Sequence, residues 1–175
     1  YELFLPKENA KEAALINGLK IFSVNTLTDL INHLEEKNII KEESPTQFIP
    51  QNLESRVDIS EIKGQEHGKR ALTVAAAGAH NLLMIGPPGA GKTMLAEALI
   101  SILPPLNLEE SINITQIYSA AGLLQNKSYI KNRPFRSPHH TASPVSIIGG
   151  GGNPKPGEVS LAHSGILFLD EMPEF

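Results

Sequence analysis

An unbroken loop rich in glycine and proline, Gly86-Pro87-Pro88-Gly89-Ala90-Gly91-Lys92-Thr93, constrains the fold of this chain more than any other feature. It matches the pattern G-x-x-x-x-G-K-[ST], in which backbone N–H groups cradle phosphates. The apolar run 81–85 precedes the loop, and the segment 94–100, rich in helix formers, follows it. Strand, loop and helix in this order bring free N–H groups and the positive helix end to an anion. We therefore predict an α/β nucleotide-binding fold, with a glycine-rich turn that caps an ordinary helix as the alternative interpretation.

The loop also predicts which residues hold ATP and Mg²⁺. Lys92 is expected to reach the β- and γ-phosphates, and the hydroxyl of Thr93 is expected to bind Mg²⁺. The expected nucleotide-binding residues are Gly86, Pro87, Pro88, Gly89, Ala90, Gly91, Lys92, Thr93 and Met94.

The second half of the predicted site lies far downstream, where the apolar run Gly165–Leu169 ends in Asp170 and Glu171. A continuous apolar run is typical of a buried parallel strand. Asp170 is expected to hold Mg²⁺, directly or through water, and Glu171 to polarise the attacking water as a general base. On its own such a run indicates only a strand and an acidic turn. Together with Lys92 it completes a predicted catalytic pair, Lys92 and Glu171.

Composition sets outer bounds on the class of protein. A chain of 175 residues with 41% apolar content can bury one core, and the lack of cysteine excludes a disulfide framework and a thiolate metal site. The start of the sequence, 1–6, lacks the basic residues and long apolar stretch of a secretory signal. No apolar run approaches the length that spans a membrane. We expect a cytoplasmic protein without a membrane partner.

The charge is unevenly distributed. The net charge is −4, yet the 47 residues 111–157 contain no acid and carry +5, so the rest of the chain carries −9. A basic segment between the two nucleotide motifs is a candidate surface for a polyanion such as DNA. Binding of nucleotide phosphate, contacts with neighbouring subunits and no role at all are the alternatives. The basic residues are Lys127, Lys131, Arg133, Arg136 and Lys155.

The pattern of apolar residues divides the chain into three sections. Residues 1–38 are predicted to form a β-α-β-α piece with strands at 2–5 and 20–24 and helices at 9–17 and 27–36; the expected N-caps are Asn9 and either Thr26 or Thr28. The polar section 39–58 contains two prolines and is predicted to be a linker. The α/β pattern begins at residue 59, with a helix at 66–79.

The region between the two nucleotide motifs is longer than a minimal β-α-β crossover, which predicts an insertion. Residues 112–124 are predicted to be helical and 133–140 extended, because each proline disfavours helix in the residue before it. The glycine-rich segment 149–157 predicts a loop or hairpin tip. His139 and His140 are expected to point to opposite faces of the extended chain, which argues against a metal site there.

Two strings resemble a known family: GQEHGKRALTVAAAGAHNLLMIGPPGAGKTMLAEAL and RPFRSPHHTASPVSIIGGGGNPKPGEVSLAHSGILFLDEMPEF. They are similar to the magnesium-chelatase-like AAA+ ATPases of the ComM/YifB type, over about residues 59–175. The resemblance implies a P-loop NTPase (AAA+) sheet flanked by helices, in which 86–93 is the Walker A loop and Asp170 and Glu171 are the Walker B pair. Residues 1–38 resemble the end of a Lon-protease-like domain.

The same resemblance implies further roles. The segment 62–65 falls where related ATPases contact adenine, and 149–157 falls where this group inserts a hairpin that is commonly directed at the pore of a hexameric ring. The basic segment would then lie near a threaded DNA, as in proteins associated with branch migration during transformation. Sensor and arginine-finger residues would follow residue 175, so residues 59–175 are expected to be only the first part of the AAA+ module. A chain of this extent is expected to bind Mg-nucleotide weakly and to hydrolyse it barely.

Three functions remain open at this point: a homo-hexameric DNA-remodelling ATPase, a magnesium-chelatase-type or protein-remodelling ATPase without DNA activity, and a Lon-like protease or adaptor. The basic insertion favours the first. The resemblance places the Ser and Lys that a Lon-type protease would use upstream of Tyr1, so nothing in these 175 residues supports peptidase activity.

Overall fold

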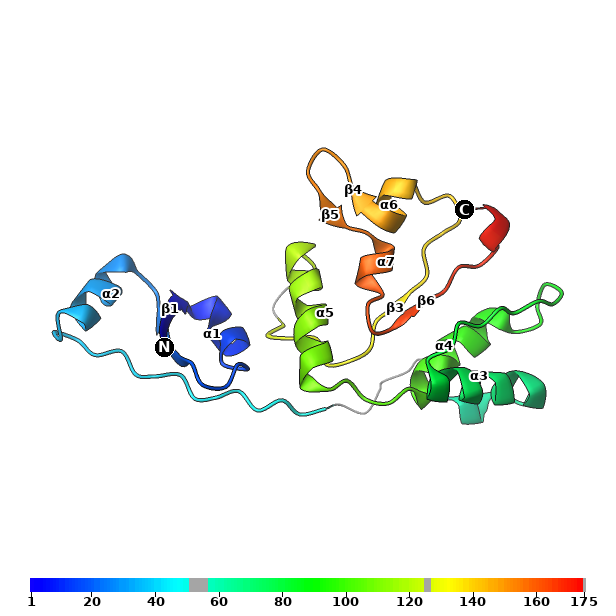
Figure 1. Cartoon of the computed structure of the whole chain (residues 1–175), viewed down its shortest axis with the longest axis horizontal. Coiled ribbons are helices and arrows are strands. Elements are labelled where there is room, and N and C mark those ends of the chain that lie inside the picture. Colours follow the sequence, from blue (N-terminus) through cyan, green and yellow to red (C-terminus); the bar gives the residue numbers. More distant parts are fainter. Residues whose placement is uncertain (51–56, 125–126, 175) are drawn as a thin grey trace. The chain divides into compact units, whose positions relative to one another are not determined.

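The computed structural model describes residues 1–50, 57–124 and 127–174. The chain forms two compact units (Figure 1). The first holds residues 1–49 with a short segment that ends at Tyr129, and the second holds the remaining described residues. Part of the predicted linker, 51–56, lies outside the described residues.

The first unit is built on two parallel strands, β1 (Glu2–Pro6) and β2 (Lys20–Val24), joined by helix α1 (Lys7–Ala13). The side chains of Ala10, Ala14 and Ile21 form its small core. Helix α2 (Leu27–Leu34) follows β2. The predicted β-α-β-α order is confirmed. Two parallel strands require a crossover connection, and α1 forms part of it.

The predicted N-caps had different outcomes. Thr26 caps α2, where its hydroxyl accepts a hydrogen bond from the Asp29 amide and the Asp29 carboxylate accepts one from the Thr26 amide. The prediction of Asn9 as a cap is wrong, because β1 runs to Pro6 and α1 begins directly after it. Asn9 therefore lies already inside the first helical turn.

The core of the second unit lies between α3 (Glu66–Gly78), α4 (Lys92–Ile102) and the short 3-10 helix η1 (Ile59–Glu61), as Figure 1 shows for the two long helices. Its buried side chains are Ile62, Leu72, Leu95 and Ala98. Gly68 lets the two helices approach, since a Cβ there would lie 3.3 Å from a methyl group of Leu95. The predicted helix at 66–79 is confirmed.

The predicted strand at 81–85 is not formed, and no strand forms anywhere in the described residues 57–124. The segment has no regular secondary structure, and Met84 packs on the core between α3 and α4. Leu83 and Ile85, by contrast, are 74% and 90% exposed. The alternation is that of a strand with one face on helices, but a strand also requires a hydrogen-bonded neighbour, and none of the described segments takes that place.

The predicted helix at 112–124 is present as α5 (Leu108–Ala120), which begins and ends four residues earlier. Asn107 and Glu110 close a capping box at its start. Strand β3 (Phe135–Arg136) pairs in parallel with β6 (Ile166–Leu167), so Phe135 lies opposite Ile166. The expected parallel strand in 165–169 is thus confirmed for two residues, and these are half-buried rather than buried.

The glycine-rich segment forms a hairpin, as predicted. Helix α6 (Pro144–Ile148) leads into β4 (Gly149–Gly150), which pairs antiparallel with β5 (Lys155–Pro156), and α7 (Glu158–Leu161) follows (Figure 1). A 3-10 helix, η2 (Met172–Glu174), follows Glu171. None of the helices among the described residues combines the length and apolar character needed to cross a membrane.

Candidate nucleotide-binding site

The loop 86–93 leads directly into α4, and two glycines give it its curvature. Gly89 and Gly91 have φ values of 75° and 82°, in the left-handed region that glycine adopts without steric cost. Gly91 is the N-cap of α4, so the amides of the first helical turn have no acceptor inside the helix. Such amides, together with the positive end of the helix, form a ready site for an anion.

Two side chains, one from the loop itself and one from the start of α3, form hydrogen bonds with carbonyl groups of the loop. The ammonium group of Lys92 donates hydrogen bonds to the carbonyl oxygens of Gly86 and Pro87, at 3.0 and 3.1 Å. The Gln65 amide, at the start of α3, donates to the carbonyl oxygen of Ala90 at 3.3 Å. Gln65 thus lies against the loop, whereas Ile62 of the same segment is buried in the core.

The two halves of the predicted site line one cavity of about 1110 Å³. Its walls are the segment before the loop, the loop with the first turn of α4, and the residues from Leu167 to Pro173. Nucleotides and other small ligands occupy cavities of about 300–1,000 Å³, so this one is large enough. Pro87 is the one predicted site residue outside the lining, which contains Gly86, Pro88, Gly89, Ala90, Gly91, Lys92, Thr93, Met94, Asp170 and Glu171.

Asp170 and Glu171 occupy a turn after β6. The Asp170 carboxylate accepts a hydrogen bond from the Glu171 amide at 3.1 Å, and Glu171 has a φ of 54°. A glutamate rarely adopts this left-handed conformation, and such strained residues cluster at functional sites. Both side chains are exposed to the cavity, so both carboxylates are available to a ligand.

The residues present fit Mg²⁺. Magnesium prefers oxygen ligands and is held by one or two protein side chains together with substrate phosphates. The Thr93 hydroxyl and the Asp170 carboxylate line the same cavity and supply that donor set. The described residues contain no group of three or more His, Cys, Asp or Glu side chains placed to hold a metal by themselves.

Sequence reasoning missed one contact of Glu171, whose Oε2 atom lies 3.1 Å from the Nδ1 atom of His140. The expectation that His139 and His140 point to opposite faces is wrong, because the chain turns at His140 and the two ring centroids lie 4.1 Å apart. No local sequence pattern signals this contact, which follows from the register of β3 and β6 in the fold. Partners in β3 and β6 are 31 residues apart, and so are His140 and Glu171.

Two of the five basic residues expected to face DNA are neutralised inside the fold. Arg133, whose side chain is 9% exposed, pairs with Glu110 at 2.9 Å, and Arg136 pairs with Glu158 at 2.5 Å. These acids lie at residues 110 and 158, on either side of the acid-free stretch. The count of basic residues in sequence therefore overestimates the positive charge that this segment presents to a partner.

The pairs also shift the pKa values of their members. Burial raises the pKa of Glu110, but hydrogen bonds from Arg133 and the Asn107 amide and the charge of Arg133 outweigh it, so its pKa lies below the ordinary 4.5. The hydrogen bond to Glu158 raises the pKa of Arg136. Both shifts stabilise the charged forms, which is the signature of structural ion pairs.

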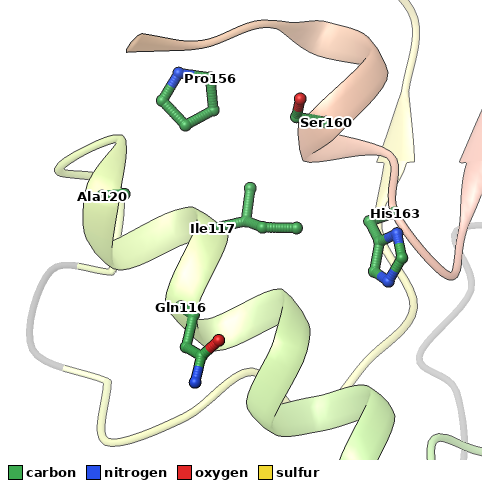
Figure 2. Close-up of a pocket in the computed structure, with 6 residues that line it drawn as sticks. All are labelled: Gln116, Ile117, Ala120, Pro156, Ser160 and His163. Atoms are coloured by element: carbon green, nitrogen blue, oxygen red, sulfur yellow. The ribbon is translucent and has the colours of Figure 1, made fainter. Parts of the chain in front are cut away.

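A second, smaller cavity of about 410 Å³ lies between α5, β5 and α7 (Figure 2). Ile117 of α5 and Ser160 of α7 lie on its opposite sides. None of the predicted site residues lines it, and it contains neither a carboxylate nor a lysine or arginine. The larger cavity is therefore the candidate for nucleotide chemistry.

Comparisons with known proteins identify relatives of this chain. The sequence model of the family described as magnesium chelatase, subunit ChlI, matches residues 58–175. The chain is 45% identical over 174 residues to the uncharacterized protein YifB of Escherichia coli K12, and 47% identical over 181 aligned positions to the competence protein ComM of Haemophilus influenzae; each alignment covers 99% of this chain. An archaeal Lon protease of Thermococcus kodakarensis is 42% identical over 52 residues, which are 30% of this chain and 8% of that protein.

The long alignments define the relationship. The chain spans about a third of the length of YifB and ComM, 34% and 35% respectively. The family match covers both the loop 86–93 and the acidic pair after β6, the two segments that meet in the larger cavity. The chain belongs to the magnesium-chelatase-like family of the ComM/YifB type.

Proposed function

We propose that the full-length protein is an AAA+ motor that binds and hydrolyses ATP and acts on DNA, in the manner of a branch-migration or helicase-type enzyme. The observation that carries this proposal is the single cavity lined by both the glycine loop and the Asp170–Glu171 pair. The competence protein ComM of Haemophilus influenzae is a relative whose name refers to competence. A homo-hexameric ring and a location in the cytoplasm are part of the proposal.

Different residues of the chain bind the phosphates and the Mg²⁺ ion of ATP in this proposal. The free amides at the start of α4 and the loop 86–93 bind the phosphates, and Lys92 places its charge beside them. Because the Lys92 ammonium already bonds two loop carbonyls, it is fixed close to the position where phosphate charge would be bound. Thr93 and Asp170 would hold Mg²⁺, which when bound neutralises charge on the transferred phosphoryl group.

Glu171 has the chemistry of the general base. Its carboxylate is exposed to the cavity and can accept a proton from a water that attacks the terminal phosphate. The backbone at this residue has a left-handed φ of 54°. We propose Lys92 and Glu171 as the two catalytic residues.

The contact with DNA would fall on the glycine hairpin. Lys155 lies in β5 of that hairpin and is exposed. Lys127 and Lys131 are further basic residues of the same acid-free stretch. The internal pairing of Arg133 and Arg136 weakens the electrostatic argument and favours the second candidate, a magnesium-chelatase-type or protein-remodelling ATPase.

The test is the ATPase rate of the full-length protein without DNA, with single-stranded DNA and with branched DNA. We expect DNA to raise the rate, Lys92→Ala to lose ATP binding, and Glu171→Gln to bind ATP but lose about a hundredfold or more in rate, as expected for a general base. Lys41→Ala, which changes an exposed lysine of the first unit, is the control. ATPase activity that no DNA alters would support the second candidate, and activity that survives Glu171→Gln would contradict the assigned site.

A further inference from the structure

The contact between His140 and Glu171 joins two segments that follow neighbouring strands. β3 and β6 run in parallel, so the residues after each strand leave the sheet at the same edge. His140 comes four residues after the end of β3, and Glu171 comes four residues after the end of β6. The register of the strands therefore carries the imidazole to the carboxylate, and the contact is a consequence of the pairing.

The imidazole is itself held in place. The His139 ring lies 4.1 Å from the His140 ring, centroid to centroid, at an interplanar angle of 36°. His139 Nδ1 is hydrogen-bonded to the Thr141 hydroxyl at 2.9 Å. The turn at His140, its ring contact with His139 and the hydrogen bond of His139 to Thr141 thus restrict the position from which His140 reaches Glu171.

Glu171 needs such a partner. Its side chain is 64% exposed, and a glutamate has several rotatable bonds that would otherwise leave the carboxylate in many orientations. An ionised carboxylate can only accept hydrogen bonds, so Nδ1 of His140 is the donor in this pair. The bond engages Oε2 and leaves Oε1 able to accept a hydrogen bond from a water molecule.

We propose that His140 is a positioning residue for Glu171: its Nδ1–H holds one carboxylate oxygen so that the other faces the attacking water. The inference rests on the proposed ATPase function and adds a residue to its machinery. His140 does not contact the nucleotide in this assignment. Its removal lowers the rate of the chemical step and leaves the affinity for ATP unchanged.

The geometry of the side chain provides a sharp test. Nδ1 is attached to the Cγ atom of histidine, and the amide nitrogen of asparagine is attached to the same position of its side chain. Glutamine places its amide one carbon farther out, near the position of Nε2. His140→Asn therefore keeps a donor for Glu171, whereas His140→Gln and His140→Ala do not.

The experiment measures kcat and KM for ATP in the full-length protein carrying each of these three variants, with Glu171→Gln in the same series. We expect His140→Ala and His140→Gln to lower kcat about tenfold or more with KM within about twofold of the wild-type value, as for the loss of a charged hydrogen bond that orients a reacting group. His140→Asn is expected to keep kcat within about threefold. His163→Ala, an exposed histidine that lines only the smaller cavity, is the matched control.

A double variant tests whether His140 acts through Glu171. If it does, His140→Ala added to Glu171→Gln lowers the residual rate no further, because the group that it positions is already lost. A wild-type kcat in His140→Ala, equal losses in the Asn and Gln variants, or a KM that rises together with the fall in kcat would each overturn the inference. If His140→Ala does not fold, the difference in kcat between His140→Asn and His140→Gln is sufficient to test the inference.

The outcomes also separate this inference from the function on which it rests. An enzyme that Glu171→Gln inactivates and His140→Ala leaves unchanged retains the proposed function and loses only the positioning role. An enzyme that Glu171→Gln leaves active refutes the assigned general base, and the role of His140 with it.

Discussion

Arg133 donates hydrogen bonds to groups from three parts of the second unit. Its guanidinium bonds the carbonyl oxygens of Pro104 and Ser164 at 2.7 Å each, and both carboxylate oxygens of Glu110. Two parallel bonds to one carboxylate are the strongest arrangement that arginine makes. With 9% of the side chain exposed, these bonds are shielded from water.

We expect Arg133→Ala to lower the free energy of unfolding by about 2–4 kcal/mol, because Glu110 and two carbonyl groups lose their partner in a half-buried site. Urea unfolding followed by circular dichroism measures the change. Arg70→Ala, an exposed arginine of α3, should change it by less than about 0.5 kcal/mol. Equal effects of the two substitutions would contradict the structural role of Arg133.

At the scale of residues, the sequence predicted the loop 86–93, Asp170 and Glu171 because their function requires a fixed local order of residue types. It did not predict His140 or the internal role of Arg133. His140 meets Glu171 through the register of two strands, and Arg133 contacts Glu110, which lies 23 residues earlier in the sequence. Contacts of that kind join residues far apart in the sequence, and their formation depends on the tertiary structure rather than on a local sequence pattern.

At the scale of elements, the hairpin formed by β4 and β5 requires glycine at position 149. Gly149 has a φ of 102°, and a Cβ there would lie 2.7 Å from the carbonyl oxygen of Lys155 in the paired strand. Gly152, at the tip of the same hairpin, has no atom within 4 Å of such a Cβ and no left-handed φ. The two glycines are therefore a matched pair.

Gly149→Ala should lower the free energy of unfolding by about 2 kcal/mol or more, since both the backbone conformation and the close approach of β5 exclude a side chain. Gly152→Ala should leave it unchanged or raise it slightly. Thermal unfolding of the two variants beside the wild type measures the difference. Similar melting temperatures for both would show that the pairing of β4 with β5 does not constrain residue 149.

The elements that were predicted well are those with complete local signals. The cap at Thr26, the helix at 66–79 and the hairpin at 149–157 each depend on residues adjacent in sequence. The segment 81–85 shows the limit, because its apolar alternation predicts a strand while strand formation depends on a neighbour. Leu83 and Ile85 are exposed and leave apolar surface on which such a neighbour could pack.

At the scale of the whole molecule, the ion pair between Glu110 and Arg133 makes the stability of the second unit depend on pH. The pKa of Glu110 is lowered in the folded state, so the folded form binds this proton less readily than the unfolded form. The stabilisation is therefore fully present above pH 4.5, the ordinary value for the group, and is lost as the pH falls through the lowered pKa.

The urea midpoint of the wild type should accordingly exceed that of Glu110→Gln at pH 6, and the gap should narrow between pH 4.5 and pH 3. Glu109→Gln removes a charge from the adjacent exposed position and controls for the effect of net charge near the start of α5. A gap that stays constant over this range would mean that Glu110 does not titrate differently in the two states.

The bonds of Arg133 also order events in time as the chain is made. Pro104 and Glu110 have already left the ribosome when Arg133 emerges, but Ser164 follows 31 residues later. At a synthesis rate of about 5–20 residues per second, the last bond waits roughly 2–6 seconds. During that interval α5 can fold against its own capping residues, while the guanidinium still has one acceptor to find. A nascent chain arrested before Ser164 would keep the bonds of Arg133 to Pro104 and Glu110 and lack the bond to Ser164.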